Sequence, residues 1–172
     1  MHREVAELCG AEQRTLVFGI RLVDDEVVAN ITADLLNLFF GVGNDARRTQ
    51  VGQVSDWIRI FNALGYLVIV VTNQRGIARG MVSQADADEL HSKMVRELSE
   101  RGARIDDIFL CPHEEDTCNC RKPRPGLVLQ AREKWDIDLG RSLMIGDSAR
   151  DEALAAACGI RFLRADGAGR LV

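Results

Sequence analysis

YLVIVVTNQRG, residues 66–76, is the stretch that decides the fold. Its first six residues are apolar without interruption, which is typical of a strand buried on both faces of a parallel sheet. Thr72, Asn73 and Gln74 follow at once. Because ligands bind beyond the carboxyl ends of the strands in such sheets, these polar residues are candidates for a functional site.

Strand-like and helix-like segments alternate along the rest of the chain. The expected strands are 15–23, 66–71, 107–110, 142–146 and 160–164, and the expected helices are 54–64, one from a Ser83–Asp86 capping box to about Gly102, one from Pro125 to Trp135, and 149–158. This order predicts an α/β fold with a central parallel sheet and helices on both faces. The length of 172 residues suits one domain, so we expect a single domain over 1–172, with 1–14 as an N-terminal extension.

Composition and charge restrict the class of protein. Hydrophobic residues make up 47% and charged residues 28%, the balance of a soluble globular protein. The net charge of −4 argues against a large nucleic-acid-binding surface. No apolar run approaches the ~20 residues that span a bilayer, and MHREVAELCG (1–10) carries charges where a signal peptide has an apolar core. We therefore expect a cytoplasmic protein without membrane contact.

Three of the five cysteines lie close together in CPHEEDTCNCRKP, residues 111–123. In a reducing cytosol such a cluster favours a bound metal over a disulfide, with metal-free or oxidised cysteines as the alternative. Glu114, Glu115 and Asp116 are expected to form a solvated loop tip rather than to bind the metal. Cys158 lies in an apolar run, so we interpret it as a small core residue.

Polar residues of complementary chemistry follow four of the expected strands. They are Asp24, Asp25 and Glu26, then Thr72, Asn73 and Gln74, then Arg121 and Lys122, then Asp147, Ser148 and Asp151. Carboxylates at two strand ends suit Mg²⁺, and a lysine and a threonine hydroxyl beside it would hold phosphate oxygens. An aspartate there could attack phosphorus. Singly, these residues could equally be caps of turns and helices or surface charges, but their joint arrangement favours phosphoryl transfer.

A family resemblance rests on three segments: VVTNQRGIARG (70–80), CPHEEDTCNCRKPRPG (111–126) and MIGDSARD (144–151). In order and spacing they resemble the haloacid dehalogenase (HAD) superfamily, most of all its branch of D,D-heptose-1,7-bisphosphate and histidinol-phosphate phosphatases. The similarity runs from about residue 54 to 166. It implies the Rossmann-like HAD fold, and the short loop between His113 and Cys118 indicates that no large cap covers the site.

The resemblance also implies a role for each matching residue. Thr72 would bind the transferring phosphoryl group, and Lys122 would steady the phosphate and the attacking carboxylate. Asp147 would bind Mg²⁺, with Asp151 orienting the groups nearby. The residues expected to contact the rest of the substrate are Asn73, Gln74, Arg79 and Arg121.

The same resemblance implies a structural zinc site. Its ligands would be Cys111, His113, Cys118 and Cys120, so that 111–120 form a zinc loop. Three thiolates and one imidazole make a closed tetrahedral set with no open position for a catalytic water. Binding of structural Zn²⁺ is worth ~10 kcal/mol or more in small peptides, enough to fix a short irregular loop and the basic residues that follow it.

The first motif departs from the family pattern, which is D-x-D-G-T/V after the first strand. Its first aspartate is the nucleophile and its second is the acid–base group. One register makes Asp24 the nucleophile and a Mg²⁺ ligand, makes Glu26 the acid–base group and retains Asn30. The other places Ile20 and Leu22 at the two aspartate positions, which leaves no nucleophile. We favour the first register because it puts carboxylates at the end of the strand.

Two functions follow from these residues. The first is a Mg²⁺-dependent phosphatase of a small phosphorylated metabolite, such as a sugar phosphate or bisphosphate. The second is a pseudoenzyme that binds a phosphorylated ligand or a protein partner without turnover. A polynucleotide 3′-phosphatase would share the chemistry, but the acidic net charge argues against it. Segment 31–53 fits the family poorly, and its apolar patch 35–40 indicates either core or contact with a second subunit or partner.

Overall fold

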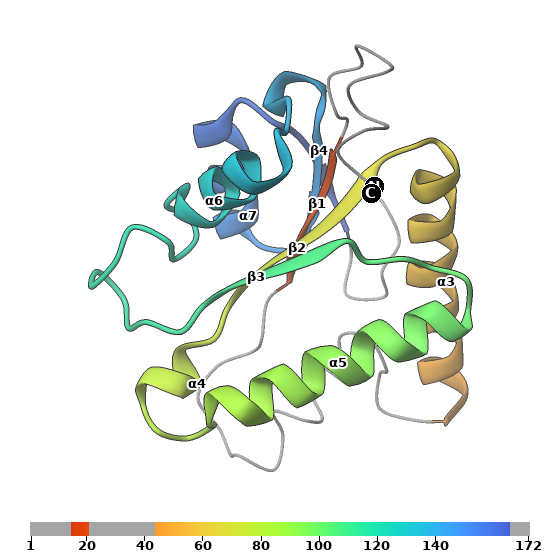
Figure 1. Cartoon of the computed structure of the whole chain (residues 1–172), viewed down its shortest axis with the longest axis horizontal. Coiled ribbons are helices and arrows are strands. Elements are labelled where there is room, and N and C mark those ends of the chain that lie inside the picture. Colours follow the sequence, from red (N-terminus) through yellow and green to blue (C-terminus); the bar gives the residue numbers. More distant parts are fainter. Residues whose placement is uncertain (1–14, 21–43, 166–172) are drawn as a thin grey trace.

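The computed structural model describes residues 15–20 and 44–165, with side chains from residue 54 onwards. Five parallel strands form one sheet in this part of the chain, in the order β3-β2-β1-β4-β5 (Figure 1). They are β1 (Thr15–Ile20), β2 (Leu67–Asn73), β3 (Asp107–Cys111), β4 (Leu143–Gly146) and β5 (Arg161–Arg164). The predicted α/β fold with a parallel sheet is confirmed.

Helices cover both faces of the sheet (Figure 1). They are α3 (Asn44–Ala63), α4 (Arg75–Ala78), α5 (Gln84–Glu100), α6 (Gly126–Trp135) and α7 (Ala149–Cys158), with a short 3-10 helix, η1 (Leu139–Arg141). α6 and α7 lie on one face, and α3 and α5 lie on the other. Between residues 44 and 165 no inserted domain separates these elements.

Alternation along β2 explains why both faces are covered. Ile69 and Val71 lie in one core with α6 and α7, whereas Val68 and Val70 lie in a second core with α3 and α5. Each of these four side chains is at most 1% exposed. A strand that must fill two cores has no position for a polar residue, which accounts for the uninterrupted apolar run.

The element boundaries agree with the sequence to within a few residues, with one exception. α3 begins at Asn44, not at the predicted residue 54. Its first ten residues, NDARRTQVGQ, lack the apolar stripe that marks the rest of the helix. The capping box of Ser83 and Asp86 at the start of α5 is confirmed. The apolar patch 35–40 lies outside the described residues.

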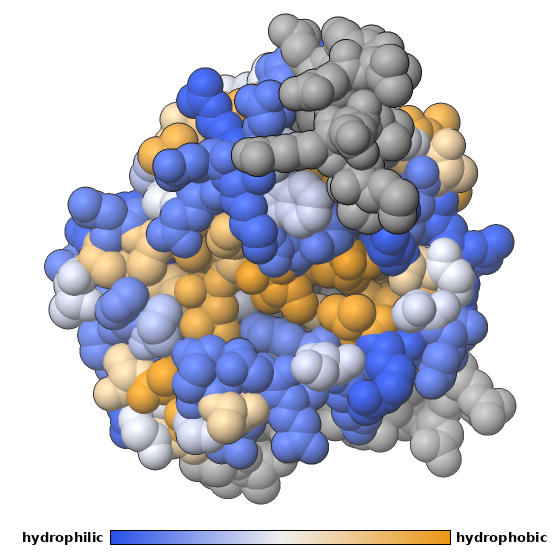
Figure 2. All heavy atoms as spheres, in the orientation of Figure 1, coloured by the Kyte–Doolittle hydropathy of each residue, from blue (hydrophilic) through white to orange (hydrophobic). Residues whose placement is uncertain are grey.

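The edge strand β3 leaves apolar side chains partly exposed. Figure 2 shows them gathered across the middle of one face, over β3, between the polar surfaces of the neighbouring helices. Ile108, Phe109 and Leu110 are each of intermediate exposure there.

Among the described helices, none is long and apolar enough to cross a membrane.

Burial of His91 is expected to make the stability of the fold depend on pH. It lies among the buried residues of α5 at 8% exposure, and burial lowers its pKa below the ordinary 6.5, although Asp88 raises it in part. Between the folded and the ordinary pKa the unfolded chain binds more protons, so stability falls as the pH falls through this window. We expect wild type to lose up to about 1 kcal/mol more than His91→Gln between pH 7.5 and 5.5, as measured by urea unfolding. Equal losses would contradict this assignment.

Candidate functional site

The carboxyl ends of three neighbouring strands form the floor of the candidate site. Thr72 lies near the end of β2, and Asp147 directly follows β4. β1 lies between these strands, with Ile20 aligned with Thr72 and Gly19 aligned with Gly146. The structure therefore places Thr72 and Asp147, which are 75 positions apart in the sequence, at the same edge of the sheet, as the sequence predicted.

Lys122 lies at this floor and is buried, with 4% exposure. Its ammonium donates to Asp151 Oδ1 at 2.8 Å and to the carbonyl oxygen of Val71 at 3.0 Å. The backbone N–H of Lys122 donates to Asn73 Oδ1 at 3.0 Å, and Asn73 Nδ2 donates to the Lys122 carbonyl at 3.2 Å. Asn73, expected to contact substrate, thus fixes the backbone of Lys122 against the end of β2.

Burial and the charges around Lys122 act on its pKa in different directions. Burial lowers the pKa of Lys122, while the nearby carboxylates of Asp151 and Asp147 raise it and Arg121 lowers it again. Asp147 is therefore close enough to act on the same ammonium, and its Oδ1 atom is buried. A buried carboxylate oxygen at a strand end suits a Mg²⁺ ion. Of the two carboxylates expected to bind Mg²⁺, the structure describes Asp147, and its buried oxygen fits the implied metal.

Asp151 uses both of its carboxylate oxygens. Oδ1 accepts from Lys122, and Oδ2 accepts from the hydroxyl of Ser148 at 2.5 Å and from its backbone N–H at 3.3 Å. Ser148 also caps α7, with Asp151 as the reciprocal partner of a capping box. The cap interpretation of this segment is confirmed, and the same carboxylate positions Lys122, so the two roles coexist.

Gly146 leaves room for this carboxylate. A Cβ atom at position 146 would lie 2.5 Å from Asp151 Cβ and 2.8 Å from its Cγ. Because Asp151 is fully buried, it cannot move aside, and we expect Gly146→Ala to cost about 1–3 kcal/mol of the free energy of unfolding. Urea unfolding measures this loss.

Gly140→Ala is the matched control. Its Cβ atom would meet nothing closer than the Asp138 Oδ1 atom, at 3.3 Å. A loss of stability in Gly140→Ala as large as that in Gly146→Ala would show that close contact with Asp151 is not the cause.

Thr72 and Gln74 are buried at the end of β2, with 1% and 6% exposure. Gln74 Nε2 donates to the Thr72 hydroxyl at 3.2 Å, and the Gln74 backbone N–H donates to the Cys111 carbonyl at 2.7 Å. A hydroxyl that accepts this bond still has its own proton to donate. The arrangement suits Thr72 to donate to a phosphate oxygen and makes Gln74 the residue that orients it.

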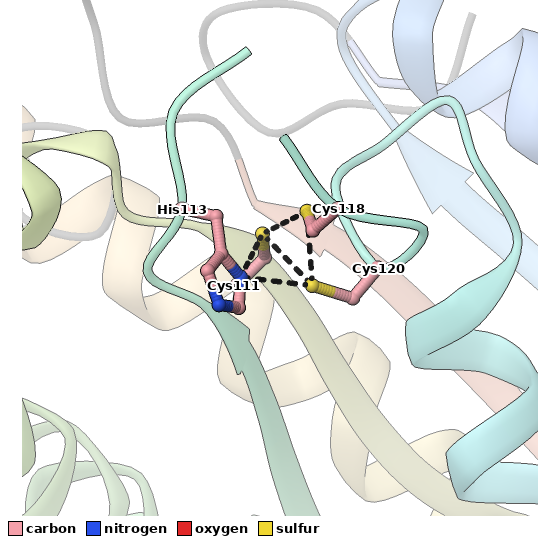
Figure 3. Close-up of side chains that lie close together, drawn as sticks. All are labelled: Cys111, His113, Cys118 and Cys120. Atoms are coloured by element: carbon pink, nitrogen blue, oxygen red, sulfur yellow. Dashed lines mark hydrogen bonds between the residues drawn. The ribbon is translucent and has the colours of Figure 1, made fainter. Parts of the chain in front are cut away.

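Four potential metal ligands converge beside this floor. Figure 3 shows the side chains of Cys111, His113, Cys118 and Cys120 pointing toward one common centre. All four ligand atoms lie within 4.8 Å of one another. The sulfur–sulfur distances are 3.1–3.5 Å, and His113 Nδ1 lies 3.3 Å from Cys120 Sγ and 3.6 Å from Cys111 Sγ.

These distances fit zinc and not a disulfide. A tetrahedral site with Zn–S bonds of about 2.3 Å has edges of about 3.8 Å, whereas a disulfide needs about 2.05 Å between sulfurs. Burial, with the neighbouring Cys111 and Cys118, raises the pKa of Cys120 to about 12. Burial opposes ionisation of Cys118 too, but hydrogen bonds from Cys120 and the Arg121 backbone lower its pKa to about 6. Three cysteines at this spacing could ionise together only beside a cation, which Zn²⁺ would supply.

The acidic tip of the cysteine loop is more structured than the sequence indicated. Glu114 accepts from Arg79 at 2.5 Å, and Asp116 pairs with Arg124 at 2.8 Å. Glu115 lies near three arginines. None of the three acids belongs to the group of potential metal ligands, as predicted. Three of these partners were missed because the contacts of Glu114 with Arg79 and of Glu115 with Arg75 and Arg150 span 35 residues or more of sequence.

Arg121 lies next to Lys122 in the sequence and is held by the cysteine loop. It is 8% exposed and donates to the His113 carbonyl at 3.4 Å, so the loop fixes it beside Lys122.

The two acids of the first motif, Asp24 and Glu26, lie outside the described residues. The described part of β1 ends at Ile20, within the strand predicted to extend to residue 23.

Curated sequences similar to this chain include phosphatases. The HAD-hydrolase-like family model matches residues 119–165. The D-glycero-beta-D-manno-heptose-1,7-bisphosphate 7-phosphatase of Rhodopseudomonas palustris is 42% identical over 134 residues, which cover 73% of this chain and 74% of the relative. The enzyme of the same name from Yersinia pestis is 41% identical over 64% of each chain.

Solved structures similar to this chain include phosphatases as well. The D,D-heptose 1,7-bisphosphate phosphatase of B. bronchiseptica, a complex with magnesium and phosphate, matches with a TM-score of 0.66 and 28% identity, over 87% of this chain and 79% of the other. A HAD-like phosphatase from Mesorhizobium loti matches with a TM-score of 0.70 and 25% identity, over 87% of this chain and 70% of the other.

Proposed function

We propose that this chain, which belongs to the HAD-like family of heptose-1,7-bisphosphate 7-phosphatases, hydrolyses one phosphate monoester of a sugar bisphosphate. The single observation that supports this most is the buried pair of Lys122 and Asp151 at the end of β2, where the Lys122 ammonium donates to the carbonyl of Val71, the residue before Thr72. A buried lysine and a buried threonine at the end of the same parallel strand suit a phosphoryl group.

The proposed reaction proceeds in two steps. A carboxylate oxygen of Asp24 attacks phosphorus while the bond from phosphorus to the sugar oxygen breaks, and Glu26 gives that oxygen a proton. Water, deprotonated by Glu26, then attacks the acyl phosphate, which releases phosphate and restores the Asp24 carboxylate. Lys122 and Thr72 hold the phosphoryl oxygens throughout. Mg²⁺ bound by Asp24 and Asp147 would neutralise the charge of the phosphoryl group.

The zinc loop has a structural part in this proposal. Cys111, His113, Cys118 and Cys120 would bind Zn²⁺ and fix Arg121 and Lys122 relative to the strand ends. Thiols remain available to zinc in a reducing compartment, so we propose a cytoplasmic location.

The substrate class is tested by comparing phosphate release from one bisphosphate and two monophosphates. We expect release from heptose 1,7-bisphosphate with Mg²⁺, and at least tenfold lower kcat/KM for heptose 7-phosphate and for histidinol phosphate, which lack the second phosphate. Similar kcat/KM values for all three compounds would contradict the proposed preference for a bisphosphate. Phosphate release that is unchanged without Mg²⁺ would contradict the proposed dependence on the metal.

One observation favours a second candidate, binding without turnover. Ile20 is the β1 residue aligned with Thr72, which is where the second register of the first motif puts the nucleophile. Asp24 lies four residues further, up to ~13 Å along an extended chain. If the second register holds, wild type is inactive and Ile20→Asp with Leu22→Asp creates Mg²⁺-dependent phosphate release. If the first holds, wild type is active and the double variant gains nothing.

A further inference from the structure

Arg164 connects the end of the last described strand to the turn that carries Asp147. β5 is aligned with β4 so that Arg164 lies opposite Gly146, the residue before Asp147. The Arg164 Nη1 atom donates to the backbone carbonyl of Asp147 at 3.2 Å, and its Nη2 atom pairs with Glu152 in the first turn of α7. One side chain therefore joins β5, the turn after β4 and the start of α7.

A third contact orients the guanidinium group of Arg164. Side chains two positions apart on a strand lie on the same face, so Phe162 and Arg164 are neighbours. The Arg164 Cζ atom lies 5.6 Å from the centroid of the Phe162 ring, and Phe162 packs against the core that contains α6 and α7. A guanidinium over an aromatic ring keeps its planar fork available for hydrogen bonds. The fork therefore presents its nitrogens to the two acceptors in a fixed direction.

Contacts within the site fix the same turn from its other side. Ser148 and Asp151 form the capping box of α7, and Asp151 binds the ammonium of Lys122. Asp147 directly precedes this box, and the bond from Arg164 reaches its carbonyl. Because Mg²⁺ demands near-ideal octahedral geometry, its affinity depends on how well each ligand is oriented. Loss of a group that orients a metal ligand typically lowers metal affinity by about 10–100-fold.

The positive charge of Arg164 would by itself oppose a cation at Asp147. The carboxylate of Glu152 offsets that charge. The two side chains are 43% and 57% exposed, so water and salt screen the remaining repulsion. The orienting effect of the hydrogen bond is therefore expected to exceed the repulsion.

We propose that Arg164 is a positioning residue for the Mg²⁺ site, which fixes the backbone of Asp147 so that its carboxylate is oriented before the metal binds. The inference rests on the proposed function only in that Asp147 binds Mg²⁺. It gives a part in metal binding to a residue that lies outside the three segments 70–80, 111–126 and 144–151.

Metal binding without turnover tests the proposal. Mn²⁺ takes the same oxygen ligands as Mg²⁺, and electron paramagnetic resonance follows its binding to the full chain. We expect Arg164→Met to raise the Kd of Mn²⁺ about tenfold, because the Asp147 carbonyl loses its partner. The urea midpoint should change little, since the lost ion pair is exposed. A merely structural role would lower the urea midpoint and leave the Kd unchanged.

Two control variants locate the effect. Arg161→Met removes the exposed arginine at the start of the same strand, and its Kd for Mn²⁺ should equal that of wild type. Asp147→Asn should abolish the binding, which would show that the measured ion occupies the proposed site.

The proposal is overturned if Arg164→Met binds Mn²⁺ as tightly as Arg161→Met or more tightly, or if Asp147→Asn binds it as wild type does. If Arg164→Met does not fold, Arg164→Lys decides, because one ammonium keeps the charge but not the fork; a wild-type Kd in that variant overturns the proposal. If wild type binds Mn²⁺ through Asp147 but releases no phosphate, weaker binding by Arg164→Met still supports the positioning role, and only the hydrolytic function fails.

Discussion

Cys111→Ser is expected to lose the zinc ion that we propose for the unaltered chain and to unfold at a much lower urea concentration. Cys111 ends β3, is fully buried and lies 3.1–3.6 Å from the other three ligand atoms. Loss of one thiolate weakens a site whose binding energy in small peptides is about 10 kcal/mol or more. Because the sheet stabilises the rest of the chain, we expect a loss of several kcal/mol rather than complete unfolding.

Cys158→Ser provides the control for this prediction. Cys158 is half-buried, packs against the core and lies outside the group of four ligands. It should retain one zinc per chain by elemental analysis. An unaltered chain purified without zinc, or equal urea midpoints for the two variants, would contradict the zinc assignment.

Lys122→Met is expected to lower the free energy of unfolding by about 3–5 kcal/mol, because it leaves the carboxylate of Asp151 without its cation in a site of 0% exposure. Methionine preserves most of the volume, so a cavity contributes little. The same variant should bind inorganic phosphate poorly, since the ammonium is the group that we propose contacts it.

Lys134→Met tests whether any lysine in an ion pair has this effect. Lys134 Nζ lies 2.6 Å from Asp107 Oδ2, but its side chain is 59% exposed. An exposed pair is worth about 1 kcal/mol or less. Similar losses in the two variants, measured by urea unfolding, would show that burial of the Lys122–Asp151 pair is not the cause.

The sequence predicted those features that depend on local spacing. The apolar run before Thr72 predicted a doubly buried strand, and the Ser83–Asp86 spacing predicted a capping box. Cys111, Cys118 and Cys120 are close in sequence, so one loop brings them together, and their clustering could be predicted from spacing alone.

Features that depend on folding at long range could not be predicted. The bonds between Asn73 and Lys122 join residues 49 positions apart, and they give Asn73 a part in supporting the Lys122 backbone that the sequence did not predict. The start of α3 was missed because its first residues have no apolar periodicity to detect. The contact of Glu115 with Arg150 spans 35 positions and joins two residues for which the sequence predicted no contact.

The measurement that tests the central claim most directly is phosphate release from heptose 1,7-bisphosphate by the zinc-loaded chain, beside Asp24→Asn, with and without Mg²⁺. The proposed function predicts release by the unaltered chain that requires Mg²⁺ and is reduced by at least about a hundredfold in Asp24→Asn, because the nucleophile is lost. No release by the folded, zinc-loaded chain, or equal release by the two forms, would contradict it.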